Sequence, residues 1–285
     1  TRSKSDLYIY DDDSETNIGN IESMVDKTVP IAVESLTTFW KTELPDTPDK
    51  MLETAEELKS RDLQQSRRWF KKAAISFQEN EMLEDAARCF MEANDYASAA
   101  DCFESAGKKE RALWADAKSS EKLDADAAVK WMKHAKLCNI EGKTGSAISS
   151  YDLAVDGFER SNKFRLAGEL GEEIATFYLR IERKYKAMEC YERVIRNYER
   201  TIDERNHENS LRVLENAMSH TNEADYEWKA KFADIKSTIL FDTRNEDAPR
   251  ISEQAAVFWA NTGRKDRQVQ SLRTSINQLA LLEKD

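Results

Sequence analysis

Residue types that could do chemistry are thinly spread along this chain of 285 residues. The tripeptide Gly142-Lys143-Thr144 matches the end of a phosphate-binding loop, but such a loop needs another glycine five residues before Gly142. Leu137 stands there instead, within an apparent helix. We therefore interpret this segment as a turn between two helices.

Metal-ligating residue types are also present. The histidines and cysteines are His134, His207, His220, Cys89, Cys102, Cys138 and Cys190. We interpret the histidines as structural or exposed residues, and no Cys-x-x-Cys pair is present. Three of the cysteines lie among alanine and aromatic residues, which favours buried thiols in a reducing compartment. The acidic run Asp11-Asp12-Asp13 lacks the ligand spacing of a calcium loop, so the sequence predicts no metal site.

The charge pattern argues against a nucleic-acid surface on this chain. Its net charge is -11, and nucleic-acid binding depends on clustered Lys and Arg that neutralise phosphates. The basic pairs Arg67-Arg68, Lys71-Lys72 and Lys108-Lys109 are short, as expected of solvated helix faces. No run of about 18 apolar residues is present, so the sequence predicts no membrane span.

The first ten residues carry the one candidate with a catalytic mechanism. The run from Thr1-Arg2 through Leu7–Tyr10 resembles motif VI of UvrD/Rep-type superfamily 1 helicases, in which a Thr-Arg pair precedes a strand of the second RecA-like domain. The resemblance covers about the first dozen residues. It implies that Arg2 is a catalytic and cofactor-binding residue that contacts the γ-phosphate of ATP. ATP and Mg²⁺ would be bound by a parent protein, and none is expected for the fragment.

Helices are expected from about Pro48 to the end. The chain holds only 8 Gly and 4 Pro, and these residues punctuate strands and turns. Thr47-Pro48-Asp49 predicts a helix start with Thr47 as N-cap. Further breaks are predicted near Asn80, Asn94-Asp95, Gly107, Lys122–Asp124, Gly142–Gly145, Ser161-Asn162, Arg183-Lys184, Glu204–Asn206, Thr221–Ala224, Arg244–Pro249 and Gly263.

A near repeat is the strongest internal signal. The segment Asp85–Asn94 is followed by Ser98–Gly107, and both contain two small residues before Cys-Phe. Weaker echoes occur at Ala147–Tyr151 and Lys186–Glu192. Paired small residues allow close approach of two helices, and the aromatic ring fills the gap to the next helix. Such a unit must stack on neighbouring units to bury its apolar face.

The segments Asp95–Gly107 and Tyr185–Glu192 resemble the second half of a tetratricopeptide (TPR) repeat. The strict 34-residue period is absent, so the resemblance implies a divergent TPR-like α-solenoid. Aromatic side chains in its first part are expected in the core, with a minority lining a peptide-binding groove. They are Trp69, Phe70, Phe77, Phe90, Tyr96, Phe103 and Trp114.

These observations predict an all-α chain with a short N-terminal strand. Residues 1–14 would end a RecA-like domain, residues 15–48 would be a helical linker, and residues 49–285 would form the repeat domain. Similar helical tails follow motif VI in large UvrD-like proteins with TPR and ankyrin repeats. The resemblance therefore implies the interaction region of an ATP-dependent helicase-like parent, in the cytoplasm or nucleus. A protein partner would bind the repeats, and nucleic acid would bind only the parent motor.

An alternative remains open on the same residues. A free-standing SNAP-like vesicle-fusion adaptor is also an all-helical, acidic, TPR-like solenoid of about this length, and it needs no catalytic residues. The strand-like start at Leu7–Tyr10 argues against an adaptor, which has no use for a strand. An all-α enzyme is a third alternative, but no residue set in the sequence supports it.

Overall fold

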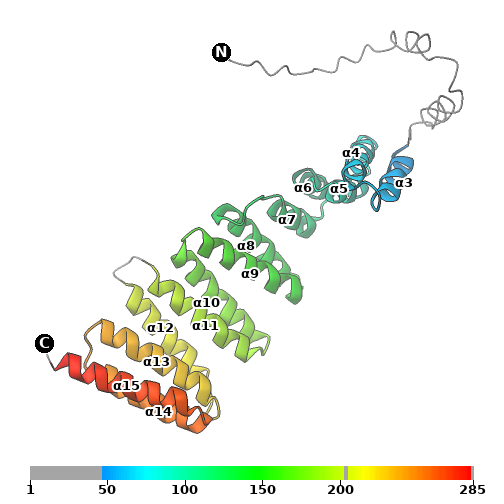
Figure 1. Ribbon diagram of the computed structural model, residues 1–285. Coiled ribbons are helices and arrows are strands. Elements are labelled where there is room, and N and C mark those ends of the chain that lie inside the picture. The colour runs from blue at the N-terminus through cyan, green and yellow to red at the C-terminus, as the bar shows by residue number, and fades with distance from the viewer. Residues whose placement is uncertain (1–46, 202–204, 284–285) are drawn as a thin grey trace, which may run out of the picture. The chain divides into compact units, whose positions relative to one another are not determined.

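The computed structural model describes residues 47–201 and 205–283 (Figure 1). Arg2, the strand expected at Leu7–Tyr10, the predicted domain 1–14 and nearly all of the linker 15–48 lie outside these residues. Within the described residues, every regular element is an α helix. The predicted all-α class is therefore confirmed for this part of the chain.

The chain divides into two compact units, residues 1–73 and 74–285, with the boundary inside one helix. The described part of the first unit contains α3 (Pro48–Leu58) and the start of α4 (Leu63–Glu79). The Thr47 side chain accepts a hydrogen bond from the backbone N–H of Lys50, and Pro48 opens the helix, as the sequence predicted. Ser66 Oγ joins the two helices by donating to the carbonyl of Ala55 at 2.7 Å.

The second unit is a stack of helical hairpins in which the main packing contacts join helices that are consecutive in the sequence. The predicted TPR-like architecture is thereby confirmed, and the predicted breaks after Asn80 coincide with the short loops. After the end of α4, its helices are α5 (Leu83–Glu92), α6 (Tyr96–Ser105), α7 (Lys109–Lys118), α8 (Ala125–Ile140), α9 (Thr144–Arg160), α10 (Phe164–Arg180), α11 (Lys184–Glu199), α12 (Asn206–Ser219), α13 (Tyr226–Asp242), α14 (Ala248–Thr262) and α15 (Lys265–Leu282).

Most of these helices end in the same way. A residue with positive φ follows the helix, such as Asn94 at 62° or Gly107 at 72°. The next backbone N–H then donates to a carbonyl five residues back, which is the bond of a Schellman turn. The carbonyls that accept this bond belong to Phe77, Phe90, Phe103, Cys138, Phe158, Tyr178 and Leu240.

The spacing of these accepting residues explains the irregular repeat. Phe77, Phe90 and Phe103 lie 13 residues apart, whereas Cys138, Phe158 and Tyr178 lie 20 apart. The 13-residue spacing spans the short helices α5 and α6, which have 10 residues each. The 20-residue spacing spans α9 and α10, which have 17 residues each and are about two turns longer. A single 34-residue period cannot describe both sets, although each helix ends by the same geometry.

Small residues bring neighbouring helices into close contact. A Cβ atom added to Gly157 of α9 would lie 2.9 Å from the carbonyl oxygen of Asp124, and one added to Gly171 of α10 would lie 2.5 Å from Val194 Cγ2. Alanines fill the same role elsewhere, and Ala86, Ala87 and Ala99 are fully buried. The close helix approach predicted from paired small residues is therefore present.

The predicted aromatic core is confirmed at most positions. Phe70, Phe77, Phe90 and Phe103 are buried. The remaining members of the predicted set, Trp69, Tyr96 and Trp114, are half-buried, and the rings of Tyr96 and Trp114 meet edge to face with 6.0 Å between centroids.

A polar contact links α10, α11 and α12. Glu172 Oε1 accepts hydrogen bonds from Tyr198 Oη at 2.7 Å and Arg212 Nη2 at 2.6 Å, and Glu172 Oε2 accepts one from Arg212 Nη1 at 2.8 Å. Burial opposes ionisation of Glu172, but the bonds from Arg212 and Tyr198 outweigh it and lower the pKa of this carboxyl from its usual 4.5. Glu172 is therefore charged at neutral pH.

We expect Phe90→Ala to lower the free energy of unfolding by about 3–5 kcal/mol, because it removes a ring that is 3% exposed and leaves a cavity. Ile140→Ala is the control, since Ile140 is 83% exposed, and it should change stability by less than about 0.5 kcal/mol. Denaturant melts of both variants measure the difference. A loss under about 1 kcal/mol for Phe90→Ala would contradict a core role.

We expect Glu172→Gln to lower stability by about 1–2 kcal/mol at pH 7, because it removes the charge that Arg212 and Tyr198 bind. The folded-state pKa of Glu172 is depressed, so its contribution is complete above the unfolded value and is lost as pH falls. The difference between variant and wild type should therefore shrink below about pH 4.5. Melts at several pH values test this, and an equal difference at pH 3 and pH 7 would refute it.

Candidate functional site

An open cavity of about 1180 Å³ lies in the second unit, among α5 to α9. We call it the α5–α9 groove. Its lining residues are Arg88, Met91, Phe103, Glu110, Arg111, Trp114, Ala117, Lys118, Ser120, Glu121, Lys122, Leu123, Ala127, Trp131, His134, Gly145, Ser146, Ser149, Ser150 and Leu153.

Large apolar side chains line this groove. Trp131 is 7% exposed and forms an edge-to-face contact with the His134 ring, with 6.1 Å between centroids. Trp114 and Leu123 pack against the core as partly buried residues. These side chains present a firm apolar wall, because their positions are fixed by the core beneath them.

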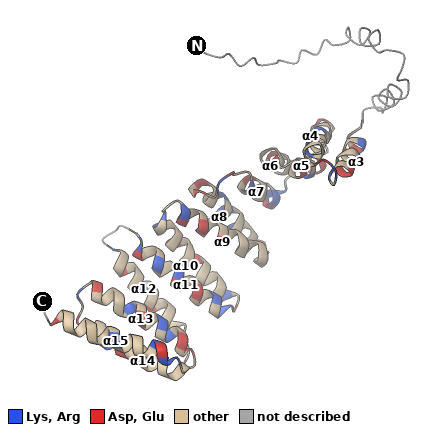
Figure 2. Cartoon of the chain, in the orientation of Figure 1, with Lys and Arg blue, Asp and Glu red and all other residues tan. Residues whose placement is uncertain are grey.

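Cationic residues outnumber acidic ones in the groove lining, four to two. Arg88 pairs with Asp85 at 3.1 Å, and the guanidinium of Arg111 lies over the Phe103 ring at 5.8 Å from its centroid. Lys118 and Lys122 are exposed and form no ion pair within the described residues. Figure 2 shows basic and acidic residues interspersed along the helices, so this local excess is unlike the chain as a whole, whose net charge is -11.

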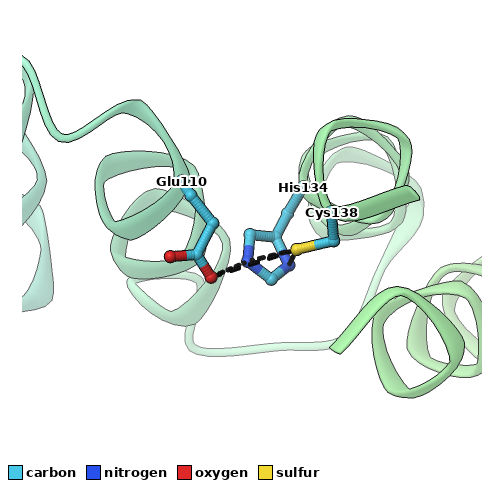
Figure 3. A group of neighbouring side chains, drawn as sticks. All are labelled: Glu110, His134 and Cys138. Atoms are coloured by element: carbon cyan, nitrogen blue, oxygen red, sulfur yellow. Dashed lines mark hydrogen bonds and ion pairs between the residues drawn. The ribbon is translucent and has the colours of Figure 1, made fainter. Parts of the chain in front are cut away.

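Glu110 and His134 line the groove, and with the fully buried Cys138 they form a polar cluster (Figure 3). Glu110 comes from α7, and His134 and Cys138 lie one turn apart on α8. His134 Nε2 lies 3.3 Å from Glu110 Oε1 and 3.4 Å from Cys138 Sγ, and Sγ lies 3.9 Å from the same Glu110 oxygen. His134 and Cys138 are almost fully buried.

Neighbouring residues hold this cluster in place. Ser150 Oγ on α9 lies 2.8 Å from His134 Nδ1, the ring nitrogen that faces away from Glu110. Lys143 Nζ lies 3.3 Å from Glu110 Oε2, the carboxylate oxygen that faces away from His134. Gly142, with φ of 73°, makes the turn that places Lys143 there, and the Lys143 backbone N–H donates to the carbonyl of Cys138 at 2.8 Å.

The surroundings set the charge of two members of the cluster. Burial opposes ionisation of Glu110, but hydrogen bonds from His134 and Lys143 outweigh it and lower the pKa of the carboxyl. Burial, followed by the charge of Glu110, raises the pKa of the Cys138 thiol to about 11. At neutral pH, Glu110 is therefore a carboxylate beside a protonated thiol.

The chain Ser150–His134–Glu110 has the connectivity of a hydrolase triad, but its setting does not suit catalysis. Ser150 is 3% exposed and lies in the interior of α9, where backbone N–H groups are engaged within the helix. Stabilising an oxyanion requires donors that point at the reacting oxygen. The arrangement fits a buried polar network better than a nucleophile.

The structure locates the other residues that the sequence singled out. Gly142 and Lys143 lie in the turn between α8 and α9, and Thr144 begins α9, so this segment joins two helices, as predicted. None of the four cysteines forms a disulfide, and Cys89, Cys102 and Cys138 are buried, as expected. His220 stacks on Tyr191. Arg2 lies outside the described residues, and its role stays a prediction.

The sequence analysis interpreted the histidines as structural or exposed residues and overlooked one His–Cys pair. His134 and Cys138 are four residues apart, which places both side chains on one helix face. That signal was visible in the sequence. Glu110 lies 24 residues before His134, and only the packing of α7 on α8 brings the two together.

Comparison with known proteins gives structural similarity only. No protein-family model and no curated protein matches the chain. One similar solved structure is BtubC (BKLC) from P. vanneervenii, with 14% identity, a TM-score of 0.31, and coverage of 83% of this chain and 89% of that chain. Another is a kinesin-light-chain candidate of Podosopora anserina with nearly identical TPR-like repeats, with 10% identity, a TM-score of 0.29, and coverage of 83% and 96%. These weak similarities carry no information about function.

A membrane-crossing role has no support in the helices that the structure describes. None of them combines the length and the apolar character that a crossing requires.

Proposed function

We propose that this protein is a protein-interaction scaffold whose α5–α9 groove binds an acidic segment of a partner protein. Stacked helical hairpins present extended surfaces that can bind other proteins. Such binding needs no catalytic group. The observation that carries the proposal is that one open groove contains tryptophan rings and two lysines without an ion pair in the described part of the chain.

The groove chemistry favours an anionic peptide with an apolar anchor. Lys118 and Lys122 form no ion pair within the described residues, so both are available to a carboxylate. The half-buried Trp114 offers aromatic surface of the kind that is enriched in binding hot spots, and Trp131, which is 7% exposed, adds only a small part of its ring. A cavity of about 1180 Å³ exceeds the usual range for small ligands, about 300–1,000 Å³, and suits several residues of a peptide.

We expect acidic peptides with one aromatic residue to bind more tightly than basic peptides of the same length. Fluorescein-labelled decapeptides of graded charge provide the probe, with fluorescence anisotropy as the readout. The double variant Lys118→Glu/Lys122→Glu should weaken binding of the acidic peptides about tenfold or more, corresponding to ~1.4 kcal/mol. Added salt should weaken binding to the wild type as well, because exposed charges are screened.

The matched control is Lys133→Glu, which reverses an exposed lysine of α8 that does not line the groove. Its affinity for the peptides should equal that of the wild type. Equal binding of acidic and basic peptides, or equal losses in the control and the groove variant, would contradict the proposal.

A helicase-like parent is a separate proposal, supported by the resemblance of residues 1–10 to motif VI and by the order of this motif and the helical tail. Under this proposal the groove belongs to the interaction region of an ATP-dependent motor, with ATP and Mg²⁺ bound elsewhere in the parent. The alternative is the SNAP-like adaptor, which has no motor. Peptide binding by the groove is compatible with both the helicase-like parent and the adaptor.

We expect Arg2→Ala to reduce ATP turnover of a helicase-like parent by about 10³-fold or more, because an arginine at the γ-phosphate stabilises transition-state charge. Turnover of the full-length parent is measured with and without the change, and circular dichroism checks that the variant is folded. Unchanged turnover, or a full-length protein without ATPase activity, would refute the motor and favour the adaptor.

A further inference from the structure

Three potential ligand atoms converge where the groove meets the buried face of α8. They are Glu110 Oε1, His134 Nε2 and Cys138 Sγ, and all lie within 4.8 Å of one another. Figure 3 shows the carboxylate of one helix facing the imidazole and thiol of the next. When the imidazole proton is on Nδ1, each of these atoms offers a lone pair, so the three can act as ligands of a cation.

The separations match one face of a tetrahedral metal site. Zn²⁺ binds sulfur at ~2.3 Å and nitrogen or oxygen at ~2.0–2.2 Å, so its ligand atoms lie roughly 3.3–3.6 Å apart. Nε2 lies 3.3 Å from Oε1 and 3.4 Å from Sγ, and Sγ lies 3.9 Å from Oε1. The distance from Sγ to Oε1 exceeds this range, and a small movement of the partly exposed Glu110 would shorten it.

We propose that Glu110, His134 and Cys138 form a three-ligand Zn²⁺ site whose fourth position is taken by water from the groove. A set of nitrogen, sulfur and oxygen ligands selects zinc over Mg²⁺ and Ca²⁺, which prefer oxygen alone. Glu110 and His134 both line the groove, so water can reach the fourth position. This inference does not depend on peptide binding.

The neighbours of the cluster act as an outer shell for the metal. Ser150 Oγ lies 2.8 Å from His134 Nδ1. With a proton on Nδ1 donated to Ser150, the ring keeps its Nε2 lone pair for the metal. Lys143 lies 3.3 Å from Glu110 Oε2 and leaves Oε1 to face the site. Outer partners of this kind fix the ligand orientation in metal sites.

Binding requires that the Cys138 sulfur becomes a thiolate, because the thiolate is the form that ligates metals. The Cys138 S–H bond breaks as the Zn–S bond forms, and the proton leaves to the solvent. The metal supplies the positive charge that stabilises this thiolate beside the carboxylate of Glu110. No electron transfer is involved.

Cobalt is the first probe, used with the whole chain after treatment with a chelator. We expect Co²⁺ to bind in a 1:1 ratio and to produce both a thiolate-to-cobalt absorption band and the intense visible bands of a tetrahedral site. Zn²⁺ should displace the cobalt and raise the melting temperature, whereas Mg²⁺ should do neither. Absence of saturable binding would overturn the proposal and leave a buried hydrogen-bonded cluster.

Variants then test each ligand. Cys138→Ser should abolish the thiolate band, and Glu110→Gln should weaken Zn²⁺ binding at least tenfold while the band persists. Ser150→Ala should weaken binding by about 10–100-fold with the band intact, as expected for an outer-shell residue. Cys102→Ser is the control, because Cys102 is another buried helix thiol outside the cluster. Loss of the band in the control rather than in Cys138→Ser would overturn the assignment.

A measurement on the wild type tests the site even if a variant fails to fold. X-ray absorption at the zinc edge should show one sulfur at ~2.3 Å and nitrogen or oxygen neighbours at ~2.0–2.1 Å. A shell with only nitrogen and oxygen, or with two or more sulfurs, would exclude the Glu110–His134–Cys138 site.

Discussion

Close packing of helix backbones through small residues is the constraint on which the second unit depends. Gly157 and Gly171 leave no room for a Cβ atom without movement of a neighbour, and alanines such as Ala86 and Ala99 are fully buried. Buried aromatic rings, such as those of Phe90, Phe103 and Tyr178, lie near the C-terminal ends of their helices. The same close packing brings side chains of different helices, such as Glu110 and His134, within hydrogen-bonding distance.

The groove lies where short helices give way to long ones. α5, α6 and α7 each have 10 residues, whereas α8 and α9 have 16 and 17. At ~1.5 Å per residue, α7 spans about 15 Å and α8 about 24 Å, so α7 cannot cover the α8–α9 hairpin along its whole length. Trp131 of α8 and Leu153 of α9 line the groove beside this step in helix length. The candidate site therefore coincides with the change of repeat length from 13 to 20 residues.

Local features of the sequence predicted the helix boundaries well, because helix ends are determined by residues that are close in the chain. Asn94 and Gly107 mark turns that need positive φ. The turn at Glu182, whose φ is 58°, contains no glycine. The only local signal for a break there is the polar run around Arg183. The break between α3 and α4 was not predicted, because no Gly or Pro stands between Lys59 and Asp62.

The candidate site was only partly predictable, because most of it depends on contacts between residues that are far apart in the chain. The spacing of His134 and Cys138 is a local property of one helix and could have been found. The approach of Glu110 depends on how α7 is offset along α8, and the position of Ser150 depends on the packing of α9. No spacing in the sequence encodes these offsets, because they result from many small packing contacts. The groove cations were likewise visible only as scattered lysines and arginines.

The electrostatics of the groove set the range over which it can attract a partner. The chain carries a net charge of -11, so an acidic peptide is repelled at long distance in dilute salt. At physiological ionic strength the screening length is about 8 Å, and a peptide inside the groove then responds mainly to Lys118, Lys122 and their neighbours. Screening therefore weakens the unfavourable field of the whole chain more than it weakens contacts at the groove, because distant charges are screened most. Recognition by this groove would thus rely on short-range contacts with lysines and tryptophans rather than on long-range steering.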